Sequence, residues 1–293
     1  ASETDSNLYY ATKFMAPDPF IYVEIKGERI LVMSDLEIDR AKSQSSVDRV
    51  LSYSEVEGRA KTQGIAEPGV VEVVHILLRE AGITQILVPA NFPFGHALKF
   101  QSLGYQLYPK RDPFYEERVV KTAEEVRSIE AAQRATEQAV AVAFDLLRRA
   151  SIENNQLWFD GIPLTSERVK KLINVSLMEC DCVAQHTIVA GGEQACDPHN
   201  EGSGPLPAHR SIIFDVFPRS ATNRYFADMS RTVVRGTPSP ELKRLYHTVL
   251  DAQEEAITKI KDGADGKRIH QGILRRFEKA GYQTGLVNGR MQG

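Results

Sequence analysis

The segment from Thr122 to Ala150 constrains the fold more than any other part of this sequence. Thr122 followed by Glu125 matches the capping box that begins many helices. Apolar or small residues then recur at steps of three and four, at Val126, Ile129, Ala132, Thr136, Ala139, Ala143, Leu146 and Ala150. This spacing predicts one long helix with a single apolar face.

The rest of the second half alternates helices with strand-like runs. A helix is predicted from about Thr165, and another from Pro240 with Ser239 as its N-cap. The second of these carries an apolar face at Leu242, Leu245, Tyr246, Val249, Ala256, Ile257 and Ile260, and a last helix covers 267–282. The order of helices, strands and helices favours an α+β arrangement, with helices covering an antiparallel sheet.

The first part of the chain predicts a layered α/β domain. A hairpin is expected at 20–25 and 29–33, then a helix at 71–82, a buried strand at 85–90, a helix at 94–104 and a strand at 105–109. The charged, proline-containing stretch 109–122 has no clear period and is interpreted as the connection between domains. We therefore expect domains at 1–117 and 118–293.

Composition excludes two classes of function. The 36 basic residues are offset by 39 acidic ones, giving a formal net charge of −3, which argues against a general nucleic-acid surface. No apolar run approaches the roughly 20 residues that a membrane span requires, and the first residues do not resemble a signal peptide. Because 3 cysteines make a poor disulfide framework, we expect a cytoplasmic protein.

Two carboxylates lie within an otherwise apolar hairpin. Asp215 belongs to the run SIIFDVF and Asp228 to the run RYFADMSRTVV, with turn residues between them. Since side chains of a strand alternate between faces, a hairpin in register would direct both carboxylates into one core-facing space. Two like charges there need a compensating cation. The spacing leaves two sources open: a shared divalent metal, or ion pairs with Arg224 and Arg231.

A histidine and three cysteines form the other candidate groups. His199, in the loop sequence CDPHNEG, has an imidazole that can donate to a substrate carbonyl, although an exposed loop histidine fits its position equally well. Cys180, Cys182 and Cys196 together with His199 offer the ligands of structural zinc. Their C-x-C spacing instead favours buried, unpaired cysteines that behave as small hydrophobic residues.

Three stretches of the chain resemble the creatinase/aminopeptidase P family of metallopeptidases. They are IVAGGEQACDPHNEGSGPL, IIFDVFPRSATNRYFADMSRTVVRG and the helix LKRLYHTVLDAQEEAI. The resemblance implies a creatinase-like α/β N-terminal domain, followed by an α+β catalytic domain of the pita-bread fold.

The resemblance also implies roles for four residues. Asp215 is similar to the aspartate that binds one metal ion, and Asp228 to the aspartate that bridges two. His199 matches the family's substrate-side histidine and is the expected catalytic residue. Thr232 is similar to a residue that lies behind Asp228 and supports it. The implied cofactors are two divalent ions, Mn, Co or Zn.

The implied reaction removes an N-terminal residue before proline, using water activated by both metal ions, as in Xaa-Pro aminopeptidases and dipeptidases. The implied partners are a small peptide with proline second and another copy of the chain in a homodimer. In that family, a histidine and two glutamates that lie later in the sequence also bind the two metal ions. We therefore expect the catalytic domain to be incomplete at its C-terminus, with two of five ligands before Gly293. Creatinase-type C–N hydrolysis, a non-catalytic binding protein and a zinc-stabilised module remain alternatives.

Overall fold

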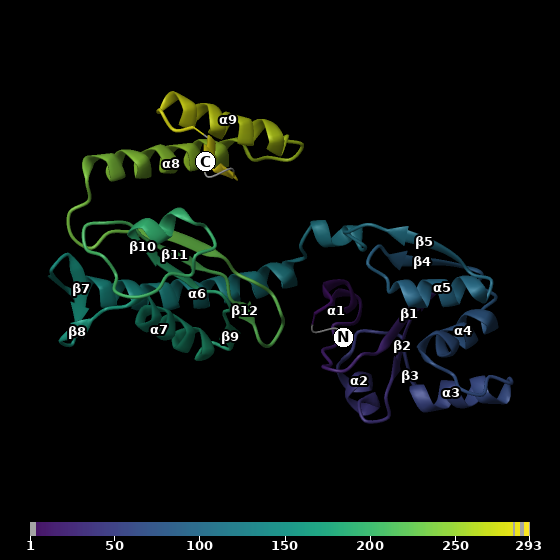
Figure 1. Ribbon diagram of the computed structural model, residues 1–293. Coiled ribbons are helices and arrows are strands. Elements are labelled where there is room, and N and C mark those ends of the chain that lie inside the picture. Colours follow the sequence, from purple (N-terminus) through teal and green to yellow (C-terminus); the bar gives the residue numbers. More distant parts are fainter. Residues whose placement is uncertain (1–3, 284, 288–289, 293) are drawn as a thin grey trace. The chain divides into compact units, whose positions relative to one another are not determined.

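The computed structural model describes residues 4–283, 285–287 and 290–292. The chain divides into two compact units, Ala1–Lys121 and Thr122–Gly293 (Figure 1). The division falls inside the stretch 109–122 that the sequence marks as a connection.

The first unit contains two small sheets and the helices around them. Its elements are α1 (Ser6–Thr12), β1 (Ile21–Ile25), β2 (Glu28–Met33), α2 (Ile38–Gln44), β3 (Arg49–Ser52), α3 (Tyr53–Thr62), α4 (Val70–Glu80), β4 (Gln85–Pro89), α5 (Phe94–Ser102), β5 (Gln106–Lys110) and the 3₁₀ turn η1 (Glu116–Val119). Strand β2 pairs antiparallel with β1 and parallel with β3, while β4 and β5 are parallel. The predicted hairpin is confirmed, with Lys26 and Gly27 both at positive φ in its two-residue turn.

Strand β4 is less buried than the sequence predicted. The helices predicted at 71–82 and 94–104 are present as α4 and α5, and they pack on the core of this unit. However, Leu87 in the middle of β4 is 57% exposed. Only one face of the β4–β5 pair meets the core, through Ile86 and Leu107, so Leu87 and its partner Tyr108 lie on the outer face.

The second unit is larger and is built around a three-stranded antiparallel sheet in the order β10-β11-β13. Its elements are α6 (Ala123–Arg149), β6 (Ser151–Glu153), β7 (Gln156–Phe159), β8 (Ile162–Pro163), α7 (Ser166–Met178), β9 (Cys182–Val183), β10 (Ile188–Gly191), the 3₁₀ turn η2 (Gly192–Cys196), β11 (Ile212–Val216), β12 (Arg219–Ser220), β13 (Met229–Val233), α8 (Pro240–Lys259), α9 (Gly266–Lys279), β14 (Gly285–Val287) and β15 (Arg290–Gln292).

Helix α6 forms as the sequence predicted, although its buried face is shifted. The capping box is present: Thr122 Oγ1 accepts from Glu125 N–H at 3.2 Å, and Glu125 Oε2 accepts from Thr122 N–H at 2.8 Å. Five of the predicted positions are buried, namely Ala132, Thr136, Ala139, Ala143 and, at the C-cap, Ala150. Val126 is instead 41% exposed, because it lies in the first turns before the helix reaches the core. The small buried side chains allow α7 to pack closely against α6.

One face of the central sheet packs on α6 and α7, as Figure 1 shows. On β11 this buried face is formed by Ile212, Phe214 and Val216. The ring of Phe214 packs edge to face on the ring of Phe144 of α6, with 5.3 Å between the ring centroids. Asp215 therefore points to the opposite face of the sheet. The expectation that Asp215 and Asp228 face the core is wrong, because the alternating face of β11 that packs on the helices is the purely apolar one.

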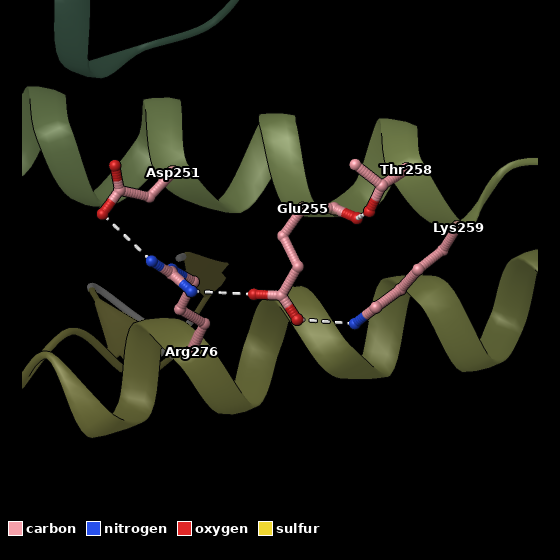
Figure 2. Close-up of polar contacts among 5 residues, drawn as sticks. All are labelled: Asp251, Glu255, Thr258, Lys259 and Arg276. Atoms are coloured by element: carbon pink, nitrogen blue, oxygen red, sulfur yellow. Dashed lines mark hydrogen bonds and ion pairs between the residues drawn. The ribbon is translucent and has the colours of Figure 1, made fainter.

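Helices α8 and α9 pack chiefly against each other. Arg276 of α9 bridges Asp251 and Glu255 of α8 with N–O distances of 3.0 and 2.7 Å (Figure 2). The apolar face predicted for α8 is mostly exposed within the described part of the chain, at Leu245, Tyr246, Val249, Ile257 and Ile260. Periodicity identified this face, but nothing among the described residues covers it.

No helix in residues 4–283 has the length and apolar character needed to cross a bilayer.

Candidate metal and substrate site

Asp215 and Asp228 lie on the same face of the sheet. Asp215 pairs in register with Ser230, and Asp228 lies two positions before Ser230, directly ahead of β13. Residues two apart on a strand share a face, so the two aspartates are diagonal neighbours, a relationship that places Cα atoms about 7–8 Å apart in antiparallel pairs. Thr232 is opposite Ile213 on this same face.

The two carboxyl groups interact directly. Ser230 Oγ donates to Asp215 Oδ1 at 2.6 Å. Burial of its inner side, and then the negative charge and hydrogen-bonding carboxyl of Asp215, raise the pKa of Asp228. Because the side chain of Asp228 is exposed, we attribute the raised pKa of Asp228 mainly to the neighbouring carboxyl of Asp215 and less to burial. The pair thus concentrates negative charge at one point on the sheet.

The guanidinium of Arg231 is not directed at this pair. The groups that shift the pKa of Asp228 include neither arginine nor lysine. Arg231 directs its guanidinium to the carbonyl oxygen of Ser230 at 2.8 Å. Of the two arginines that the sequence offered as partners, Arg231 therefore does not pair with these aspartates. A divalent cation remains the partner that their chemistry fits.

The two carboxylates supply only part of a metal site. Their oxygens are hard donors, which suit divalent ions such as Mn²⁺ or Mg²⁺. Across residues 4–283, 285–287 and 290–292, no group of three or more His, Cys, Asp and Glu side chains is arranged to hold a metal. The cysteines are free and differ in environment: Cys182 is buried, Cys180 is half-buried and Cys196 is exposed. The structure therefore does not form the zinc site considered from the sequence.

The loop that carries His199 is held at its tip by its own side chains. His199 N–H donates to Asp197 Oδ1 at 3.1 Å, and Gly202 N–H donates to Asn200 Oδ1 at 2.9 Å. The Gln194 side chain closes the base of the loop, because its Oε1 accepts from Ser203 N–H at 3.0 Å and its Nε2 donates to Ser203 O at 3.1 Å.

The same loop is fastened to β10, the strand beside Asp215. Glu201 O accepts from Val189 N–H at 3.1 Å, and the adjacent Ile188 pairs in register with Asp215. Gly202 has φ +76° and lies so close that a Cβ there would be 2.0 Å from Val189 O, so no other residue fits. Lys170 Nζ also donates to the carbonyl of Gly202 at 2.9 Å.

His199 itself is exposed at the tip of this ordered loop. Among the described residues no hydrogen bond reaches its imidazole, although its backbone is well held. A side chain presented in this way is available to a molecule outside the chain.

The sequence predicts Asp215, Asp228, Thr232 and His199 as site residues, and it does not indicate the side chains that contact them. Thr232 shares the face of Asp228 but makes no hydrogen bond to it in the described structure, so its supporting role stays a prediction. Ser230 was given no role, whereas its hydroxyl donates to Asp215. Its position two residues after Asp228 is the signal that could have identified it.

Comparisons with known proteins show what this chain is similar to. The model of metallopeptidase family M24 matches residues 127–291. An uncharacterized peptidase of Staphylococcus haemolyticus is 24% identical over 287 residues, which cover 95% of this chain and 74% of the relative. An Xaa-Pro dipeptidase of Pyrococcus horikoshii is 23% identical over 280 residues, covering 94% of this chain and 71% of that protein.

Solved structures agree on the fold. Prolidase from Pyrococcus furiosus superposes with a TM-score of 0.75 at 20% identity, over 95% of this chain and 74% of its own. An X-Pro aminopeptidase from Thermotoga maritima superposes with a TM-score of 0.76 at 18% identity, over 99% of this chain and 81% of that protein. The expected fold, an α/β domain followed by a pita-bread domain, is confirmed by these likenesses. With the family model matching more than half of its residues, the chain belongs to metallopeptidase family M24.

Proposed function

We propose that this protein is a metal-dependent peptidase that removes the N-terminal residue preceding proline from a small peptide. The observation that carries the proposal is the pair Asp215 and Asp228, held next to each other on one open sheet face. The chain belongs to a metallopeptidase family, and two neighbouring carboxylates are donors that suit a divalent ion. Two relatives named Xaa-Pro dipeptidase and X-Pro aminopeptidase support the choice of substrate.

Asp215 and Asp228 would bind the metal, and the surroundings of the two carboxylates differ. Ser230 fixes the rotamer of Asp215 through its 2.6 Å hydrogen bond. Asp228 faces both Asp215 and solvent, which suits a carboxylate shared between two ions. When bound, a pair of divalent ions supplies Lewis acidity and lowers the pKa of water. We propose Mn, Co or Zn for this role.

His199 would act on the substrate side. Its imidazole can donate a hydrogen bond to the carbonyl oxygen of the bond before proline, where negative charge develops during hydrolysis. The hydrogen bonds of Asp197, Gln194 and Gly202 keep the loop in place before substrate arrives. This preorganisation avoids the cost of ordering the loop during the reaction. We also retain a homodimer and a cytoplasmic location as parts of the proposal.

Replacing one carboxylate tests the proposal. Asp228→Asn keeps the shape of the side chain but removes its charge, so Mn²⁺ content and hydrolysis of an Ala-Pro dipeptide or an Ala-Pro-Ala tripeptide should both be lost. Asp160→Asn, in an exposed turn outside the site, is the matched control and should retain both. Full hydrolysis by Asp228→Asn would refute the proposal. Turnover of creatine in place of both peptides would favour creatinase-type hydrolysis.

A second candidate is a protein that binds peptides without cleaving them. The observation that favours it is the limited donor set, since fewer than three metal-binding side chains gather at any point in the described residues. Calorimetric titration with Ala-Pro separates the two functions. Binding of the dipeptide that depends on His199, without hydrolysis at any Mn²⁺ concentration, would support the binding protein over the peptidase.

A further inference from the structure

We infer that Glu125 is a positioning residue for Asp228, acting through Tyr225. This inference rests on the proposed metal site and adds to it a contact with the start of helix α6. Tyr225 lies in the loop between β12 and β13, three positions before Asp228. Its hydroxyl donates to Glu125 Oε1 at 2.7 Å, which joins residues 100 positions apart in the sequence.

Both carboxylate oxygens of Glu125 are used. Oε2 accepts from the backbone N–H of Thr122 and completes the capping box, while Oε1 accepts from Tyr225. The residue is only 9% exposed. A carboxylate with so little access to water is costly unless its oxygens keep their donors, so loss of the Tyr225 hydroxyl cannot be replaced freely by solvent.

Capping α6 does not by itself require this arrangement. The cap uses one oxygen of Glu125, and an exposed glutamate would serve it equally well. The second oxygen is directed at a residue of the loop that leads into Asp228. The geometry therefore couples the fixed end of a long, buried helix to the segment that sets the position of the metal-binding carboxylate.

Backbone hydrogen bonds connect the segment that contains Tyr225 to the residue before Asp228. Tyr225 O accepts from Ser220 N–H at 2.9 Å, and Ala227 N–H donates to Pro218 O at 3.0 Å. Tyr225 N–H in turn donates to Asn223 Oδ1 at 3.1 Å. Because Ala227 immediately precedes Asp228, a shift of Tyr225 moves a short hydrogen-bonded segment that ends at the carboxylate.

Two single variants and their combination test the inference. Tyr225→Phe removes only the hydroxyl, and Glu125→Ala removes the oxygen that accepts from it, together with one half of the capping box. In the metal-free protein, amide hydrogen exchange of residues 221–229 should become about tenfold faster in Tyr225→Phe. Tyr246→Phe, which changes an exposed tyrosine of α8, is the matched control and should leave that segment unchanged.

Mn²⁺ binding, followed by calorimetry and by the electron paramagnetic resonance signal of the ion, separates positioning from general destabilisation. Each single variant should weaken Mn²⁺ binding about tenfold and alter the signal, as loss of a supporting hydrogen bond does at metal sites. The double variant should be no weaker than the worse single variant, because both break one contact. Effects that multiply in the double variant, or unchanged exchange in 221–229, would overturn the inference. Absence of Mn²⁺ binding in the unaltered protein would instead reject the proposed metal site, while the exchange data still decide whether Glu125 holds the segment.

Discussion

Ser230 Oγ lies 2.6 Å from Asp215 Oδ1, across the pairing of β11 with β13. This hydroxyl fixes the carboxylate in one rotamer, so Ser230→Ala should weaken Mn²⁺ binding about tenfold. Ser230→Thr keeps the hydroxyl on a strand residue and should bind like the unaltered protein. Isothermal titration measures both affinities, and equal Mn²⁺ affinity in Ser230→Ala would show that Asp215 needs no support from Ser230.

Two glycines of the His199 loop provide a matched test of backbone packing. Gly202→Ala combines φ +76° with a Cβ placed 2.0 Å from Val189 O, whereas Gly204→Ala has φ +70° and no atom within 4 Å. Gly204→Ala should therefore cost about 1 kcal/mol of unfolding free energy from the positive φ alone. Gly202→Ala adds a clash with backbone and should cost about 3–4 kcal/mol. Urea unfolding followed by Trp158 fluorescence measures both, and equal losses would contradict the role of the Val189 contact.

The ion pairs between α8 and α9 predict a dependence on pH and salt. Hydrogen bonds from Lys259, and then those from Arg276, lower the pKa of Glu255 below its ordinary value of 4.5. A carboxyl with a lowered folded pKa adds stability above its unfolded value, and this stability is lost as the pH falls below 4.5 through the folded value. Arg276→Ala should therefore reduce the helical content retained on heating at pH 7, and by less at pH 3.

Arg275→Ala, one position away on the exposed side of α9, is the control for that experiment. It should have little effect at either pH. Circular dichroism at 222 nm measures the helical content, and 1 M salt should shrink the effect of Arg276→Ala because exposed charges are screened. A loss of equal size at pH 3 and in high salt would mean that packing of the arginine stem, rather than its charge, holds the helices together.

The lowered pKa of His75 leads us to expect that the first unit loses stability in mild acid. Burial, and then the charge of Arg79, lower the pKa of His75 below its ordinary value of 6.5, against a smaller opposite effect of Glu72. The unfolded chain therefore binds a proton more readily, so stability is complete above pH 6.5 and falls as the pH drops below it. Urea unfolding, followed by amide signals of α4, should shift to lower urea between pH 7.5 and 5.5. His75→Gln, which cannot titrate, should show a smaller shift; an equal shift would assign the loss to other groups.

The placement of the Asp215 and Asp228 pair was predictable in part, for a reason that lies in strand geometry. Alternation along β11 and β13 correctly placed Asp215 and Asp228 on one face. The same alternation opposes a purely apolar set, Ile212, Phe214 and Val216, to Ile213 and Asp215, so the expectation that the aspartates face the core overlooked the apolar set of β11. Helices α6 and α7 pack on this apolar set.

The supporting contacts were beyond the reach of sequence reasoning. The pattern at Thr122 and Glu125 is fully explained by a capping box, so it gives no sign that Glu125 also binds Tyr225. The α8 periodicity identified an apolar stripe, but it carries no information about whether another segment covers it. Local patterns specify elements and faces, whereas contacts between distant segments depend on the packing of the whole unit.

The mutual packing of α8 and α9 has a consequence for the cooperativity of unfolding. A helical pair whose contacts are chiefly internal can melt without dismantling the sheet, so this chain need not unfold in a single all-or-none step. Its 1 tryptophan, Trp158, belongs to β7 and reports on the body of the second unit alone. Fluorescence and circular dichroism should consequently give different midpoints, and a single free energy of unfolding would not describe the protein.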